Sequence, residues 1–178
     1  MRKISLAVVV TGFVVAAWPG TAAAQLSDQQ LGERVAATIR SYTQYTIFDH
    51  IDLNVLEGKV TLTGRVTHQI KKDEIAARAA KVQGVREVSN KIGVLPLSPL
   101  DQDLRLRIAE SIYNHPLFWH YGQMSRPPIH IIVENSQVTL EGVVSTETER
   151  NLANSRARVM GTLQVINNLR LDAKPKRQ

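Results

Sequence analysis

Five residues with apolar, aromatic and cationic side chains lie close together in the sequence: Phe118, Trp119, Tyr121, Met124 and Arg126. Tryptophan and tyrosine combine an apolar body with a polar tip, which suits the headgroup region of a bilayer, and arginine can pair with phosphate. We therefore take residues 114–128 as a candidate lipid-binding loop with these five residues as its contacts. The alternative is that the rings complete a core or seal a contact between domains.

Nothing in the sequence is typical of a catalytic or metal site. The five histidines are scattered, and His115 and His120 are separated by a proline, whereas zinc commonly uses three or four ligands at short spacing. There is no Gly-x-Ser-x-Gly elbow, phosphate-binding glycine loop or His-Glu-x-x-His motif. The 178 residues contain no cysteine, which excludes disulfides, thiolate ligands, a cysteine nucleophile and an acylated cysteine. We predict no catalytic residue, no metal and no cofactor.

The first 24 residues have the pattern of a secretory signal peptide. Arg2 and Lys3 precede an apolar stretch over 4–17, and small residues at 22–24 form a candidate cleavage site. The apolar stretch is shorter than the roughly 20 residues of a membrane-spanning helix, although a retained anchor is the alternative. Export predicts a periplasmic protein.

The positive charge of the chain is not concentrated on a folded region. The formal net charge is +6, but residues 27–97 carry 10 basic and 8 acidic groups and residues 98–172 carry 7 and 8. A nucleic-acid-binding protein concentrates positive charge on one folded face, so we expect no nucleic-acid partner. The tail 173–178 is basic, and we expect it to be a flexible end that adds electrostatic attraction to an anionic membrane.

One sequence pattern occurs twice, at an offset of 77–78 residues. Gly58–Val66 matches Ser136–Val144, and the residues that precede and follow this segment match as well. The opening helices align at an offset of 73, so the second copy has a connection five residues longer before its first strand. We predict two domains, 27–96 and 99–172, with a linker short enough for them to pack together.

Each copy has the periodicity of helix, strand, strand, helix, strand. In the first copy, apolar residues recur at helical spacing from Leu31, and alternate over 51–55 and 60–66. Ser27 and Gln30 have capping-box spacing, and Lys71–Val82 is predicted to form the second helix. A third strand is expected over 88–94 and, in the second copy, over 165–171. Asn90 and Asn167 on these strands, and Gly64 and Gly142 on the hairpins, are interpreted as structural.

The repeated pattern resembles the BON family, the bacterial osmotic-stress and nodulation domain. The residues that carry the resemblance in the first copy include the hairpin from Gly58 to Val66, Gly84-Val85, Val88 and Asn90. The fold class implied is α+β, with two αββαβ sandwiches, each a three-stranded mixed sheet with two helices on one face. Ser136 and Thr162 depart from the family pattern, but Asn135 tolerates the left-handed conformation that the second hairpin needs.

Two copies behind a signal peptide are similar to osmotically inducible periplasmic proteins of this family. The resemblance implies a non-enzymatic protein that binds anionic phospholipid surfaces peripherally and supports the envelope under stress. Two alternatives stay open: an adaptor that docks an envelope protein through the 114–128 loop, and a small-ligand or ion sensor. The sequence gives neither the oligomeric state nor the lipid preference.

Overall fold

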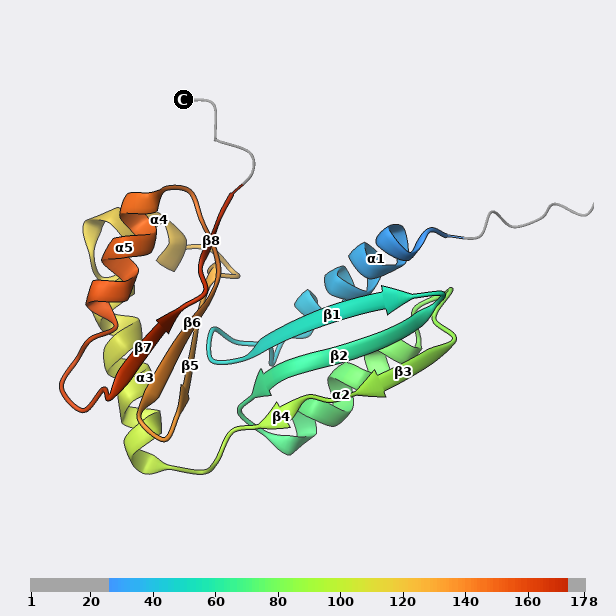
Figure 1. The fold of residues 1–178 in the computed structure, drawn as a ribbon, viewed down its shortest axis with the longest axis horizontal. Helices are drawn as coiled ribbons and strands as arrows, with labels where there is room; N and C mark the ends of the chain where they lie inside the picture. The colour runs from blue at the N-terminus through green and yellow to red at the C-terminus, as the bar shows by residue number, and fades with distance from the viewer. Residues whose placement is uncertain (1–25, 173–178) are drawn as a thin grey trace, which may run out of the picture.

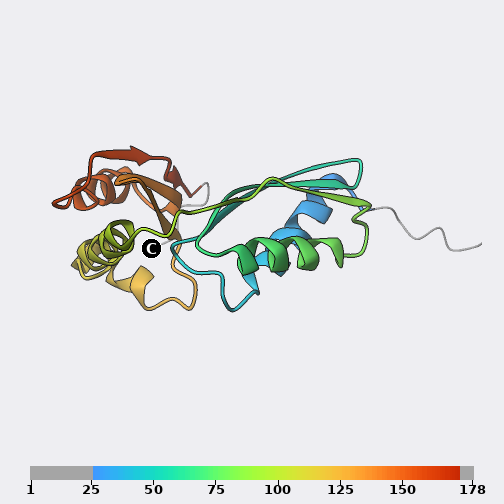
Figure 2. The same ribbon diagram turned by 90° about the horizontal axis from the view of Figure 1, so that it is seen from below.

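The computed structural model describes residues 26–172, so the predicted signal peptide and the basic tail lie outside the described residues. The first module contains two helices packed on one face of a mixed sheet (Figures 1 and 2). Its elements are α1 (Asp28–Arg40), β1 (His50–Leu56), β2 (Lys59–Val66), α2 (Gln69–Ala80), β3 (Glu87–Asn90) and β4 (Gly93–Val94). Strand β2 pairs antiparallel with β1 and parallel with β3 and β4.

The second module repeats this topology with one additional helical segment. Its elements are α3 (Pro99–Tyr113), the 3₁₀ turn η1 (Pro116–Phe118), α4 (Trp119–Gly122), β5 (Ile129–Glu134), β6 (Gln137–Val144), α5 (Glu147–Arg156), β7 (Gln164–Asn167) and β8 (Arg170–Leu171). Strand β6 is central, antiparallel to β5 and parallel to β7 and β8. The predicted fold class, two α+β units with mixed sheets of three ordered strands, is confirmed.

The third strand of each module is divided, which differs from the continuous strands predicted. In the first module, the side-chain Oδ1 of Asn90 accepts from the backbone N–H of Ile92, and its Nδ2 donates to the Lys72 carbonyl. Asn167 makes the equivalent bonds to Leu169 and Arg150. The asparagine thus turns the chain out of the strand and ties it to the second helix, which confirms its structural role.

The hairpin turns are fastened to the opening helices. Glu57 and Gly58 have φ of 50° and 77°, and Asn135 and Ser136 have φ of 53° and 62°, the double positive φ of a type I′ turn. In the first module Asp28 accepts hydrogen bonds from both turn N–H groups, at 2.8 and 3.1 Å. Asp101 does the same in the second, at 2.9 and 2.8 Å. One carboxylate therefore holds each hairpin against its helix, a role that sequence inspection did not identify.

The glycines on the central strands permit a close backbone approach. Gly64 and Gly142 have φ of 115° and 120°. A Cβ at Gly64 would overlap the carbonyl oxygen of His50, and one at Gly142 would overlap that of Pro128. Both positions therefore require glycine, in agreement with their predicted structural role.

The two modules pack against each other, as the short linker predicts (Figure 1). The backbone N–H of Ile131, on the edge strand β5, donates to the carbonyl of Ile47 at 2.7 Å. Ile47 and Phe48, which precede β1, pack against the core of the second module. The Tyr45 and His130 rings lie 5.5 Å apart across this contact. The segment before β1 therefore belongs to the first module by sequence and partly to the second by packing.

Candidate lipid-facing segment and the intermodule surface

The segment 114–128, predicted as a loop, contains regular structure instead. His115 caps the turn η1 by accepting a hydrogen bond from the Leu117 N–H at its Nδ1, at 3.2 Å. The 3₁₀ turn leads directly into the four-residue helix α4. Tyr113, at the end of α3, donates its hydroxyl to the Ile129 carbonyl at 2.6 Å, which bridges the two ends of the segment. Its conformation is therefore fixed by contacts at both ends.

Phe118 and Tyr121 are buried, which contradicts the expectation that their rings face a membrane. Phe118 is 0% and Tyr121 4% exposed, and both belong to the core of the second module. The Tyr121 hydroxyl donates to Glu149 at 2.9 Å and accepts from the Ser145 N–H. Burial raises the pKa of Tyr121, so the phenol keeps its proton for this bond. These two residues anchor the segment, as the core alternative proposed.

The other three candidate residues are exposed. Trp119 is 65% and Met124 40% exposed, and Arg126 is exposed as well. Leu117, which sequence analysis did not single out, adds a side chain that is 36% exposed. The segment therefore exposes three apolar side chains within eight positions, Leu117, Trp119 and Met124, followed by a cation. Several large exposed apolar side chains on one short segment are typical of contact surfaces.

The position of Tyr121 matches that of a buried aspartate in the first module. Asp49 is fully buried and accepts hydrogen bonds from the N–H and hydroxyl of Thr46 and of Thr67. It also pairs with Lys71 at 2.6 Å. Thr67 and Lys71 correspond in the repeat to Ser145 and Glu149, the partners of Tyr121. The longer connection of the second module thus delivers a tyrosine to the place where the first module has an aspartate.

This buried pair explains the titration behaviour of Asp49. Burial alone raises the pKa of a carboxyl group, but the ammonium of Lys71 and the donors of Thr46 and Thr67 outweigh it. The pKa of Asp49 is therefore lowered, and the carboxylate stays ionised. Sequence reasoning missed this cluster because its members are separated by up to 25 positions, with no local motif.

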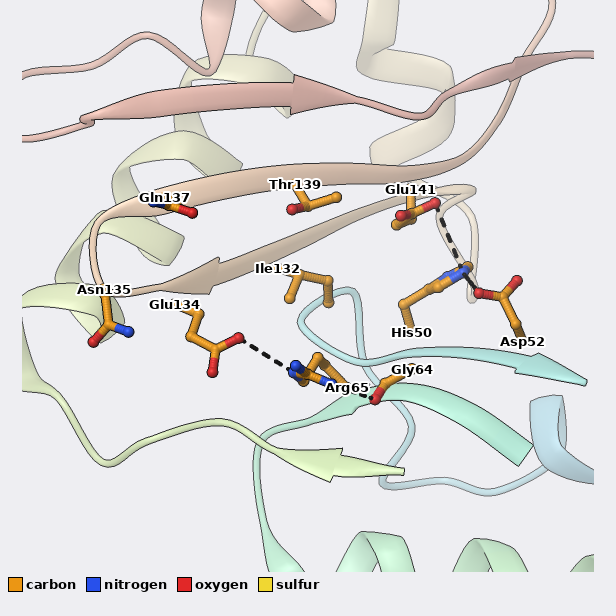
Figure 3. A pocket seen from close by; sticks show the side chains of 10 residues that line it. All are labelled: His50, Asp52, Gly64, Arg65, Ile132, Glu134, Asn135, Gln137, Thr139 and Glu141. Carbon is orange, nitrogen blue, oxygen red and sulfur yellow. Dashed lines mark hydrogen bonds and ion pairs between the residues drawn. The ribbon is translucent and has the colours of Figure 1, made fainter. Parts of the chain in front are cut away.

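A polar groove of about 330 Å³ lies between the first module and the open face of the second sheet (Figure 3). Arg65 donates to Glu134 across it at 3.2 Å. His50 Nε2 lies 3.3 Å from Asp52 and 3.8 Å from Glu141. The Arg65–Glu134 ion pair therefore joins the two modules across the groove, whereas His50 Nε2 makes no hydrogen bond with a described residue.

Neither the groove nor the buried cluster has the composition of a catalytic centre. No group of three histidine, aspartate or glutamate side chains within residues 26–172 is placed to hold a metal ion. Burial and the neighbouring His50 ring lower the pKa of His130, whose Nδ1 has no hydrogen-bond partner in the described part of the chain. No hydroxyl nucleophile is hydrogen-bonded to either ring there.

The repeated module matches a known domain family. The family model of the BON domain matches residues 27–96 and 101–173. The chain belongs to the BON family. Its two BON domains cover most of the sequence, and the two matched ranges correspond to the two modules seen in the structure.

A curated relative of this tandem BON protein is the outer membrane lipoprotein DolP of Haemophilus influenzae. The two are 27% identical over 165 residues, which span 90% of this chain and 85% of the relative. Two solved structures of CdsD, a structural protein of the type III secretion system of Chlamydia trachomatis, match with 12% identity. They cover 76% and 79% of this chain and 96% and 94% of their own, with TM-scores of 0.31 and 0.29. A likeness of that size carries no functional inference.

The comparisons support an envelope assignment at a coarse level. BON proteins of this kind are generally non-enzymatic, and the DolP relative is named as a membrane lipoprotein. Within the residues that the structure describes, no helix has the length and apolar character needed to cross a bilayer. The sequence also holds no cysteine to carry the lipid of a lipoprotein.

Proposed function

We propose that this tandem BON protein is a non-enzymatic periplasmic protein that binds anionic phospholipid surfaces reversibly, in envelope maintenance or osmotic stress protection. The observation that carries the proposal is the exposed side chain of Trp119 on a segment that Phe118 and Tyr121 anchor in the core. The membrane association of a lipoprotein relative supports the class of partner.

The surface has the chemistry that an interface requires. Leu117, Trp119 and Met124 would enter the boundary between headgroups and acyl chains, where an indole is favoured. Arg126 would pair with a lipid phosphate. Because the segment is already ordered, binding costs little additional conformational entropy. The basic tail, which lies outside the described residues, would add a salt-sensitive attraction.

Tryptophan fluorescence tests this directly. The chain from Gln25 onward contains every described helix and strand, and Trp119 is its single tryptophan. We expect its emission to shift to the blue with vesicles that contain phosphatidylglycerol, and not with pure phosphatidylcholine vesicles. Added salt should weaken the response.

A matched pair of variants distinguishes membrane insertion from general adhesion. Burying the exposed part of an indole contributes on the order of 2–4 kcal/mol, so Trp119→Ala should weaken co-sedimentation with anionic vesicles by at least about 30-fold. Leu163→Ala removes an apolar side chain that is 78% exposed, in the turn before β7, and should leave co-sedimentation unchanged. Equal binding by both variants, or no binding by the parent chain, would overturn the proposal; a co-purifying envelope protein would then favour the adaptor.

A further inference from the structure

A second cavity between the modules is lined by two arginines. It has a volume of about 530 Å³, within the range of small-ligand sites. Arg40, at the end of α1, and Arg126, after α4, contribute the cations, and Tyr45, Ile47 and His130 are among the other lining residues. The site exists only because the two modules pack together, since each module supplies one guanidinium group.

Neither guanidinium group has a partner among the residues that the structure describes. The side chains of Arg40 and Arg126 make no hydrogen bond or ion pair with any residue of 26–172. Among the described residues that line the cavity there is no aspartate or glutamate, whereas hydroxyl groups of Thr43 and Ser125 are present. Two like charges that face one space without a counterion favour an anionic ligand.

Two carboxylates, Asp49 and Asp52, act electrostatically on Tyr45, which lines the cavity. Asp49 pairs with the Lys71 ammonium and accepts four further hydrogen bonds from Thr46 and Thr67. Asp52 lies 3.3 Å from His50 Nε2. Asp49 is therefore engaged within the first module, whereas Asp52 is exposed and lines the adjoining cavity rather than this one. Among the described residues, the cavity between Arg40 and Arg126 has two cations and no carboxylate in its lining.

An adjoining cavity extends the cationic surface. Its volume is about 280 Å³, and it shares Arg40, Tyr45 and His130 with the first. It adds Arg170, which is exposed and has no ion pair with a described residue, and one carboxylate, Asp52. Apolar walls from Ile47 and Pro128 lie beside the cations, so the space suits an anion attached to a small organic group.

We propose that the cavity between Arg40 and Arg126 binds a phosphate ester, held by the two guanidinium groups. Arginine binds phosphate through paired, charge-assisted hydrogen bonds, and each module would supply one arginine to the same group. The proposal deepens the proposed function by giving it a headgroup site, while its recognition chemistry is the same for a lipid phosphate and for a soluble phosphate ester.

The test uses the full chain at constant ionic strength. Glycerol 3-phosphate is titrated and the backbone amide signals of Thr43 and Ser125 are followed by NMR. We expect saturable shifts whose affinity falls about tenfold or more in Arg40→Gln. Arg34→Gln is the matched control, because Arg34 is an exposed arginine of the same helix outside the cavity. Arg126→Gln should reproduce the Arg40→Gln loss from the other module.

A parallel titration with phosphatidylglycerol vesicles identifies the source of the phosphate. If Arg40→Gln weakens vesicle binding relative to Arg34→Gln, the site accepts a lipid headgroup; if it affects only glycerol 3-phosphate, the ligand is a soluble ester. The inference is overturned if Arg40→Gln and Arg34→Gln behave alike with both probes. Trp119→Ala tests the proposed function separately. If vesicle binding depends on Trp119 and not on Arg40, the cavity is rejected as a lipid-headgroup site, while the proposed membrane binding is retained.

Discussion

Truncation to alanine should lower the free energy of unfolding strongly at Phe118 and only slightly at the adjacent Trp119, although both are large aromatic residues. Phe118 is fully buried and Trp119 is 65% exposed. A buried phenylalanine removes roughly 150–250 Å² from water, and at about 25 cal/mol per Å² the part lost in Phe118→Ala accounts for about 3–4 kcal/mol. With the cavity that remains, the expected loss of unfolding free energy is about 3–5 kcal/mol.

That loss is large for a module of this size, whose total stability is roughly 4–11 kcal/mol. Trp119→Ala should cost less than about 1 kcal/mol, because most of the indole is already in water. Urea unfolding of both variants, followed by far-ultraviolet circular dichroism, measures the difference. We expect a midpoint at least about 2 M lower for Phe118→Ala. Equal midpoints would refute the division of the segment into a buried anchor and an exposed contact surface.

Two further predictions concern the scaffold. Gly142→Ala should destabilise the second module by at least about 2 kcal/mol in thermal unfolding, because the φ of Gly142 is 120° and a Cβ would overlap the Pro128 carbonyl. Gly122→Ala is the control: the nearest atom to an added Cβ is 3.6 Å away, so this variant should unfold at the parent temperature. Asp49 has a lowered pKa, so its contribution to stability is present above the ordinary value of 3.8 and is lost as the pH falls through the lower, folded value. Asp49→Asn should lower the free energy of unfolding by about 3–5 kcal/mol at neutral pH, because it leaves Lys71 unpaired. The same variant should show a smaller decline of the urea midpoint between pH 5 and 3 than the parent chain. An undiminished decline would contradict the lowered pKa of Asp49.

The sequence predicts most of the fold because each element carries a local signal. The Ser27–Gln30 capping box forms as its spacing predicts, and Asn135 and Ser136 adopt the positive φ that the second hairpin requires. The third strands are less well predicted, because the side-chain bonds of Asn90 and Asn167 that interrupt them depend on the neighbouring helix. Local periodicity carries no information about such a partner.

The candidate site is predicted less completely, since burial depends on how the segment packs. Composition marks residues 114–128 as unusual but does not separate Phe118 and Tyr121 from Trp119. Their spacing offers a signal in retrospect: residues three apart share a face of a helical turn, so Phe118 and Tyr121 face the core together and Trp119 faces away. The arginine-lined cavity depends on the packing of the modules and has no counterpart in the sequence pattern.

The divergence between the two copies explains why the proposed contact surface lies on the second. In the first module Asp49 and Lys71 close the end of the sheet with an ion pair, and the preceding segment packs onto the neighbouring module. In the second, Tyr121 replaces the aspartate and bonds to Glu149, and the longer connection that supplies this tyrosine also contains Trp119. The same insertion therefore completes one core and leaves an indole exposed. A surface built in this way needs no opening of the fold to become available, so the proposed membrane contact and the folded state are compatible with each other.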